Sequence, residues 1–317
     1  MNNLALKYTK EIGHVSVKIQ DLLDNAKFPE ESFENPKRQK FYENCLYYHK
    51  KQKGLIRVSK YGFNYSADEK RKCLKKRGIQ IETSNTNFLY NDESTDDTKI
   101  WYMNFADKYA FTEWGSYSTS LEAVQTVQMP LLHKTCSYLK SYAKERPEIS
   151  LMDNRTVYRD EEGFYNPIPI LFEGVPVWLK IDAEKAEPIQ AEKRTNIISM
   201  LSSFGGKGIY KEGHILYLLY TLFAGFGGIE KLGIRDKKFS SVLYTGNWGC
   251  GIMKNNKELI YLSQLCVADF TGINKIVFHK CDESALKNAV EKYHLLIDEM
   301  SFVEFAAFLV NQNYEWN

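Results

Sequence analysis

Short apolar runs alternate with polar and glycine-rich turns along the chain, most clearly between residues 239 and 279. Residues 241–245 form an apolar run of strand length, and the glycine-rich stretch 246–251 follows it directly. The next segment has the spacing of a helix, with one apolar face formed by Leu259, Leu262, Cys266 and Val267. Asn255 or Asn256 can cap this helix, and Gly272 follows its end. With the apolar strand 276–278, this unit predicts an α/β fold whose sheet is at least partly parallel and covered on both faces.

Other segments carry similar signals. Residues 99–105 are apolar and aromatic and predict a strand. The run Thr119-Ser120-Leu121-Glu122 matches a helix capping box, and we expect the helix to pause at Pro130 and to resume through Tyr142. Helices are also predicted over 211–223 and 283–300, and from Ser301, where a second capping box ends at Glu304.

Charge is distributed unevenly along the chain. The whole chain carries a net charge of +2, whereas residues 36–77 hold fourteen lysines and arginines against three acids, interleaved with aromatic residues. Such a stretch can bind a polyanion, or it can be a solvated helical face whose aromatic residues pack on the core. The acidic, turn-rich segment 84–97 follows and predicts a boundary or a mobile loop. We therefore expect a basic, largely helical N-terminal extension with an acidic linker over 1–97, and the α/β domain over 98–317.

Several classes of protein are excluded by what the chain lacks. It has no apolar run of transmembrane length and no secretory signal pattern at its N-terminus. Its six cysteines are scattered without a C-x-x-C pair, and no two histidines have metal-ligand spacing with a carboxylate. We expect a cytoplasmic protein with reduced thiols, no membrane partner, no metal and no cofactor.

The glycine-rich stretch Gly246-Asn247-Trp248-Gly249-Cys250-Gly251 is the strongest candidate for chemistry. Three glycines at a strand end let a ligand approach the main chain, and successive N–H groups there can bind an anion such as phosphate. The stretch matches neither the P-loop nor the dinucleotide fingerprint. From the residues alone, a phosphate-binding loop and a plain tight turn both remain open.

Preceded by Thr245, this stretch resembles the T-G-N-W-G-C-G segment of the poly(ADP-ribose) glycohydrolase family, whose catalytic domain is a macrodomain. Upstream, residues 104–109 resemble the family's D-F-A-N-K-Y strand end, and weaker similarities extend the resemblance over residues 98–282. The resemblance implies a macrodomain-like, three-layer α/β/α fold with a mixed central sheet. It also implies that residues 245–252, including Ile252, hold the diphosphate of ADP-ribose, with Asn104 and Asp107 near its sugars. Core packing is the alternative role for Trp248 and Cys250.

The family's catalytic signature, a glycine triplet followed by Gln-Glu-Glu, is incomplete here. Of the triplet only Gly115 remains, and Leu121-Glu122-Ala123 stands where the family has Gln-Glu-Glu. Glycoside hydrolysis needs a carboxylic acid that protonates the leaving oxygen. Glu122 is the first candidate for this acid and Glu113 the second; alternatively, Glu122 only caps its helix.

Three functions follow from these observations. The first is an ADP-ribosyl glycohydrolase that acts on ADP-ribose polymers or ADP-ribosylated macromolecules. The second is a catalytically silent macrodomain that binds ADP-ribose, which the incomplete signature favours. The third is an immunity or inhibitor protein against an ADP-ribosyltransferase toxin.

Overall fold

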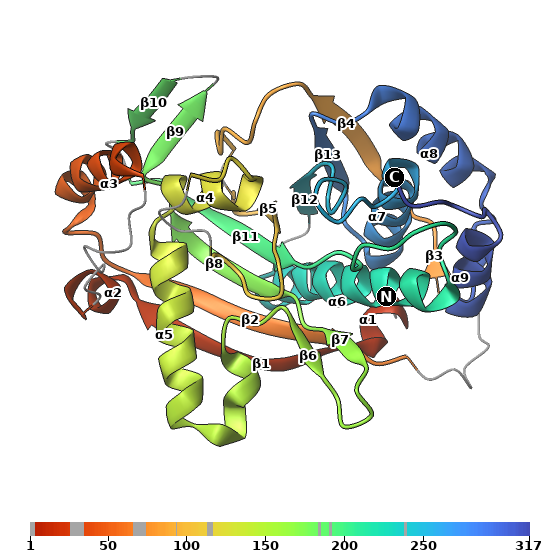
Figure 1. Cartoon of the computed structure of the whole chain (residues 1–317), viewed down its shortest axis with the longest axis horizontal. Helices are drawn as coiled ribbons and strands as arrows, with labels where there is room; N and C mark the ends of the chain where they lie inside the picture. Colours follow the sequence, from red (N-terminus) through yellow and green to blue (C-terminus); the bar gives the residue numbers. More distant parts are fainter. Residues whose placement is uncertain are drawn as a thin grey trace.

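A mixed eight-stranded sheet forms the centre of the protein (Figure 1). The computed structural model describes residues 4–25, 35–65, 74–92, 94–112, 117–182, 185–189, 192–237 and 240–317. In sheet order the strands are β1 (Thr9–Lys18), β2 (Leu55–Phe63), β8 (Ile170–Pro176), β11 (Arg194–Met200), β5 (Thr98–Phe105), β12 (Ser240–Thr245), β13 (Lys275–His279) and β4 (Gln80–Ser84). The pairs from β1 to β11 are antiparallel, and those from β11 to β4 are parallel. The predicted α/β class and mixed sheet are confirmed.

Helices cover both faces of this sheet, because strand residues alternate between two apolar cores. In β5, Trp101 and Met103 face the core with α6 (Glu212–Arg235), α7 (Lys257–Thr271), α8 (Glu283–Leu295) and α9 (Phe302–Val310). The intervening Ile100 and Tyr102 face the core with α2 (Ile19–Asn25) and α5 (Leu131–Glu145). Helix α4 (Leu121–Gln128) packs on β5 and precedes α5, with Pro130 between them as predicted. The protein therefore has three layers.

The remaining elements lie outside the central sheet. They are α1 (Leu4–Tyr8), α3 (Pro36–His49), β3 (Leu74–Lys75), the 3-10 helix Pro147–Met152, β6 (Val157–Arg159), β7 (Tyr165–Pro167), β9 (Leu179–Asp182), β10 (Lys185–Pro188) and β14 (Glu299–Met300). The pairs β6–β7, β9–β10 and β3–β14 form two-stranded ribbons outside the central sheet.

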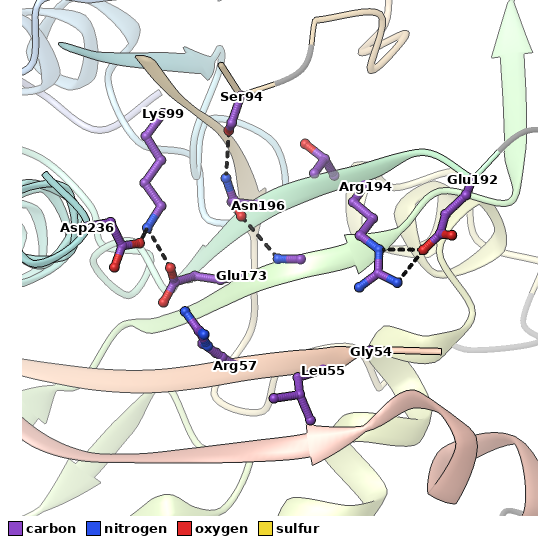
Figure 2. Close-up of a pocket in the computed structure, with 12 residues that line it drawn as sticks. Gly54, Leu55, Arg57, Ser94, Lys99, Glu173, Glu192, Arg194, Asn196 and Asp236 are labelled. Carbon is purple, nitrogen blue, oxygen red and sulfur yellow. Dashed lines mark hydrogen bonds and ion pairs between the residues drawn. The ribbon is translucent and has the colours of Figure 1, made fainter. Parts of the chain in front are cut away.

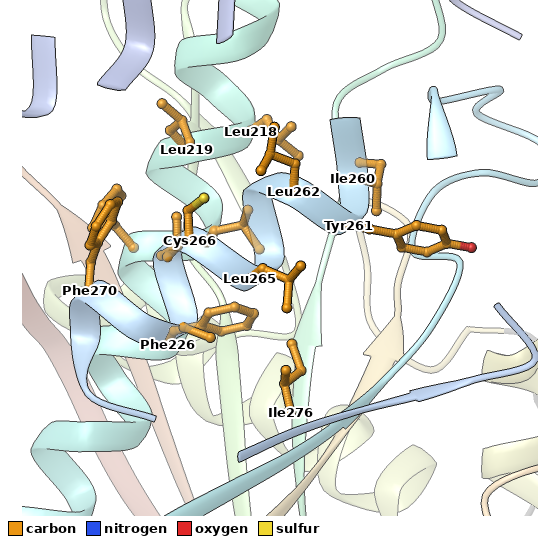
Figure 3. Close-up of a cluster of buried hydrophobic side chains, with 14 of the residues drawn as sticks. Leu218, Leu219, Phe226, Ile260, Tyr261, Leu262, Leu265, Cys266, Phe270 and Ile276 are labelled. Carbon is orange, nitrogen blue, oxygen red and sulfur yellow. The ribbon is translucent and has the colours of Figure 1, made fainter. Parts of the chain in front are cut away.

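Helices α6 and α7 pack against each other in the larger core (Figure 3). Leu218, Leu219 and Phe226 of α6 meet Leu262 and Leu265 of α7. Helix α6 is long and apolar enough to cross a membrane by length and composition, but 72% of its apolar window is buried inside the protein. Burial of this kind is what a central helix of a folded domain requires.

The expectation of a largely helical extension over residues 1–97 is wrong, because β1, β2 and β4 from this segment are strands of the central sheet. In β2, Ile56 and Val58 are fully buried while Leu55 and Arg57 are exposed, so Arg57 occupies a solvent-facing position of the strand. Lys60 of the same strand is fully buried and donates to Arg155 O at 2.7 Å. The segment 84–97 is not a linker either. Its Tyr90 is fully buried and packs on Tyr102 of β5 with ring centroids 4.6 Å apart.

Candidate functional site

The glycine-rich loop lies at the carboxyl end of β12, between that strand and α7. Strands β12 and β13, which precede and follow α7 along the chain, pair in parallel. The predicted strand–loop–helix–strand unit is therefore confirmed. Asn256 caps α7 by accepting the N–H of Leu259 at 3.1 Å, and Gly272 ends the helix with a φ of +111°. In open α/β sheets the crevice beyond such strand ends is where ligands bind.

The loop leaves part of its main chain available to a ligand. Cys250 N–H donates to Asn247 O and Asn255 N–H donates to Gly249 O, which fixes the bend. Within the part of the chain that the structure describes, no acceptor takes the N–H groups of Gly249, Gly251 or Ile252. A cradle of unpaired main-chain donors binds anions.

Gly249 is required at its position by its backbone angle and by its neighbours. Its φ is +70°, and a Cβ at this point would lie 2.1 Å from Ser202 Oγ. Any side chain there would combine an unfavourable backbone conformation with a clash, so the loop can pack on the 202–203 segment only with glycine at this point.

The side chains of the loop anchor it to the protein. Trp248 is fully buried and donates its indole N–H to Met200 O at 3.0 Å, so packing accounts for this residue. Thr245 is also fully buried and donates to Gln264 Oε1 at 2.5 Å. Asn247 donates to Lys280 O at 2.8 Å and accepts the Tyr261 hydroxyl. The main chain of the loop, rather than its side chains, is therefore what a ligand would meet.

Nearby N–H groups would lower the pKa of the Cys250 thiol, but burial has the larger effect. Burial raises the pKa of this thiol to about 12. At neutral pH the group is a thiol, which is a poor nucleophile.

Two adjoining cavities lie in front of the loop. The larger has a volume of about 610 Å³ and extends from Asn247, Gly249 and Ile252 across to Asp107 and Glu122. The smaller, of about 410 Å³, is lined by Asn247 as well but reaches toward aromatic and polar side chains, namely Phe88, Phe105, Gln128 and His279. The loop bend is therefore open to a ligand of considerable size on both sides of Asn247.

Glu122 lies in the wall of the larger cavity and does not cap its helix as a capping-box residue would. The N-cap of α4 is Ser120, whose Oγ accepts the N–H of Ala123 at 3.1 Å, so Glu122 is one position early for that role. Its carboxylate instead accepts the main-chain N–H of Phe111, and the side chain is 4% exposed. The capping interpretation is wrong for this residue.

The other predicted site residues differ in their placement. Asp107 is exposed and lines the larger cavity. Asn104 is fully buried, donates to Gln125 Oε1 at 2.8 Å and accepts the Ser199 hydroxyl at 2.7 Å, so it supports the site from behind. Glu113 lies outside the residues that the structure describes.

Three residues of the site were missed in the sequence. Asn255 is fully buried, and its amide donates to Gly249 O at 3.0 Å and to Ser202 Oγ at 3.2 Å, which holds the loop to the end of β11. Gln128 and His279 line the smaller cavity, and Gln128 Nε2 and His279 Nε2 are buried without a hydrogen-bond partner among the described residues. Only the position of Asn255 next to the helix cap offered a signal.

His279 is a neutral imidazole with a defined tautomer. Thr86 O accepts a hydrogen bond from His279 Nδ1 at 2.9 Å, because a carbonyl oxygen can only accept. Burial lowers the pKa of this imidazole. Its Nε2 is therefore a hydrogen-bond acceptor in the wall of the smaller cavity.

A third cavity, of about 770 Å³, lies at the opposite edge of the sheet, where β5 and β11 begin (Figure 2). Its charged side chains neutralise one another. Lys99 Nζ lies 2.5 Å from Glu173 and 2.6 Å from Asp236, and Arg235 lies 3.0 Å from Glu173. This arrangement is an ion-pair cluster.

No protein-family model and no curated protein matches the sequence. One match is the solved structure of poly(ADP-ribose) glycohydrolase from Thermomonospora curvata bound to the inhibitor ADP-HPD. The match covers 69% of this chain and 79% of that chain, at 15% identity and a TM-score of 0.42. That of the Deinococcus radiodurans enzyme with ADP-ribose covers 68% of this chain and 85% of its own, at 14% identity and a TM-score of 0.39. The chain is thus similar to the bacterial poly(ADP-ribose) glycohydrolases, at low sequence identity.

Proposed function

We propose that this protein is an ADP-ribosyl glycohydrolase, which binds one ADP-ribose unit in front of the glycine-rich loop and hydrolyses its ribosyl glycosidic bond. The observation that carries the proposal is the cavity of about 610 Å³ that separates the unpaired N–H groups of this loop from the carboxylate of Glu122. Main-chain donors suit a diphosphate, and a carboxyl group across the cavity suits the sugar that the diphosphate carries.

The smaller cavity suits the base of the same ligand. Phe88 and Phe105 supply apolar walls, His279 Nε2 supplies an acceptor and Gln128 Nε2 a donor. An aminopurine has both a donor and an acceptor on its edge and a ring that packs on aromatic side chains. Because both cavities share Asn247, a nucleotide can extend from one into the other.

In this proposal Glu122 is the general acid. Its proton goes to the glycosidic oxygen as the bond to the anomeric carbon breaks. A water molecule then adds to the oxocarbenium-like centre and gives up a proton to the Glu122 carboxylate, which restores the acid. Ala123 leaves the chain without the second carboxylate of the family signature. The reaction thus depends on one acid.

A catalytically silent ADP-ribose-binding protein is the second candidate. Glu122 already accepts the N–H of Phe111, a use that a structural carboxylate would have, and this contact favours the second candidate. Binding is expected in both cases, and only turnover separates them.

We further propose that α3 contacts the polyanionic part of the substrate. Lys37 and Lys40 of this helix are exposed, and Arg38 donates to Ser118 O in the rim of the larger cavity. Lys75 and Lys76 lie at the other end of the molecule, at β3, beside α8 and β14 (Figure 1). The basic residues that the structure describes between 36 and 77 are therefore dispersed, and of the two groups compared here the α3 group is the one near the site.

The test combines calorimetry with a release assay. We expect ADP-ribose to bind wild-type protein and Glu122→Gln with similar affinity, and only wild type to release ADP-ribose from an ADP-ribosylated protein or polymer. Glu283→Gln, at the exposed start of α8, is the matched control and should release at the wild-type rate. If all three proteins bind ADP-ribose and none releases it from the substrate, the glycohydrolase is rejected and the silent binding protein is supported. If none binds ADP-ribose at millimolar concentration, both functions are rejected.

A further inference from the structure

We propose that Trp316 and Tyr210 are positioning residues for the glycine-rich loop, so that residues 314–317 act as a strap that sets the ligand-binding geometry. The inference rests on the proposed function in one respect, namely that this loop binds the ligand. Neither Trp316 nor Tyr210 lines the two cavities in front of the loop, so any effect on a ligand must pass through the loop.

The strap lies between two segments that border the site. On one side, Tyr210 N–H donates to Tyr314 O at 2.9 Å and Trp316 N–H donates to Gly208 O at 3.0 Å. On the other side, Asn317 N–H donates to Lys254 O at 3.0 Å, and its side-chain amide donates to the main-chain oxygen next along the loop, Asn255 O, at 2.7 Å. The strap therefore joins the segment after β11 to the end of the glycine-rich loop.

Trp316 fixes the ring of Tyr210. The two rings stack with centroids 4.1 Å apart and an interplanar angle of 10°, and both side chains are largely buried. Gly206 covers the indole so closely that a Cβ there would lie 2.4 Å from the ring. Stacked between the strap and the core, Tyr210 has little freedom to move.

Tyr210 transmits this constraint to the loop through Asn255. The tyrosine hydroxyl donates to Asn255 Oδ1 at 3.0 Å and accepts the N–H of Asn256 at 2.9 Å. The amide of Asn255, thus oriented, donates to Gly249 O at 3.0 Å. Because Gly249 has a left-handed backbone angle, its carbonyl contact determines which way the neighbouring N–H groups of the bend point.

Two variants separate this role from simple stability. Trp316→Ala removes the stacking partner, whereas Tyr210→Phe keeps the ring and removes only the hydroxyl. In each we expect ADP-ribose affinity by calorimetry to fall roughly tenfold, the effect of one lost, well-oriented hydrogen bond. Trp316→Phe keeps an aromatic ring on Tyr210 and should restore most of the affinity.

Phe305→Ala is the matched control. Phe305 is a fully buried aromatic residue of α9 that packs on Phe270, away from the loop. This variant should unfold at a lower temperature and still bind ADP-ribose as wild type does. If it weakens binding as much as Trp316→Ala, the effect is general destabilisation and the inference is overturned.

Hydrogen exchange tests the strap without a ligand. The N–H groups of Cys250, Lys254 and Asn255 are hydrogen-bonded within the loop and report on its order. We expect them to exchange faster in Trp316→Ala and Tyr210→Phe than in wild type and Phe305→Ala. Unchanged exchange in Tyr210→Phe overturns the inference even where Trp316→Ala fails to fold. If wild type does not bind ADP-ribose, the proposed function is rejected. The hydrogen-exchange rates of the loop still test whether Trp316 and Tyr210 position it.

Discussion

The carboxylate of Glu122 accepts the main-chain N–H of Phe111, a residue that itself has a φ of +55°. The same residue's carbonyl oxygen lies 3.0 Å from Nδ1 of His133. Side chains from α4 and α5, Glu122 and His133, thus hold Phe111 in an unfavourable backbone conformation.

This contact predicts different stabilities for two variants that both lack the acid. Glu122→Gln keeps an oxygen that accepts the Phe111 N–H, so its free energy of unfolding should lie close to that of wild type. Glu122→Ala leaves a buried N–H unpaired and should lose about 1–3 kcal/mol in chemical denaturation. Equal losses in both variants would show that the hydrogen bond does not support the loop.

The second prediction concerns two glycines of the same loop. Gly249→Ala meets a positive φ and a contact of 2.1 Å with Ser202, whereas a Cβ at Gly251 meets nothing within 4 Å. We expect Gly249→Ala to lose about 2 kcal/mol of stability and most of its ADP-ribose affinity. Gly251→Ala should remain close to wild type in stability, and equal losses of stability in the two variants would contradict the geometry described here.

The third prediction is a dependence of stability on pH that arises from Glu230 of α6. Burial raises the pKa of this carboxyl to about 7. The folded state therefore binds more protons than the unfolded state between about pH 4.5 and 7, and stability from this group is lost as the pH rises through that window. Glu230→Gln should be more stable than wild type at pH 8, by on the order of 2 kcal/mol, and similar to it at pH 5.

The control for this prediction is Glu212→Gln at the exposed start of the same helix. Thermal unfolding of all three proteins at pH 5 and pH 8 measures the difference. A gain at pH 8 that also appears at pH 5 would assign the effect to packing rather than to ionisation.

The fourth prediction concerns the ion-pair cluster at the opposite edge of the sheet. Lys99 and Glu173 are both almost fully buried, and replacing Lys99 by Met removes the more buried of the two cations, Lys99 and Arg235, that contact both Glu173 and Asp236. We expect a loss of about 3 kcal/mol in the free energy of unfolding. Arg57→Ala, an exposed cation in the same cavity, should change it by less than about 0.5 kcal/mol.

The fifth prediction tests the basic helix. Reversing the charge of Lys37 and Lys40 should weaken binding of poly(ADP-ribose) and flatten its dependence on salt, because fewer counterions are released. Reversing Lys75 and Lys76 should leave both unchanged, since these residues lie far from the cavities. Equal effects of the two pairs would show that net charge, and not the position of α3, matters.

The local pattern predicted the part of the fold whose cause is local. The strand, glycine loop, capped helix and second strand around the candidate site follow from apolar spacing, from Asn256 and from Gly272, and each is present in the structure. The break at Pro130 and the capping box at Ser301 are present as well. In each case residues a few positions apart interact directly, so the sequence contains the whole cause.

The N-terminal segment was predicted wrongly because its strands depend on distant partners. β2 pairs with β8, more than a hundred residues later, and that pairing determines which of its residues are buried. A run of basic residues looks helical until its partner strand shows that Arg57 faces solvent while Lys60 is buried and donates to Arg155 O.

The sequence by itself determined the α/β class and the glycine-rich bend, because backbone freedom and apolar spacing are properties of contiguous residues. Only the tertiary structure decided that Glu122 faces this bend across a cavity, that Asn104 is enclosed behind it, and that Asn255, Tyr210 and Trp316 support it. These relationships join residues up to about 150 positions apart. Their distances are set by the packing of whole helices on the sheet, which no local pattern specifies.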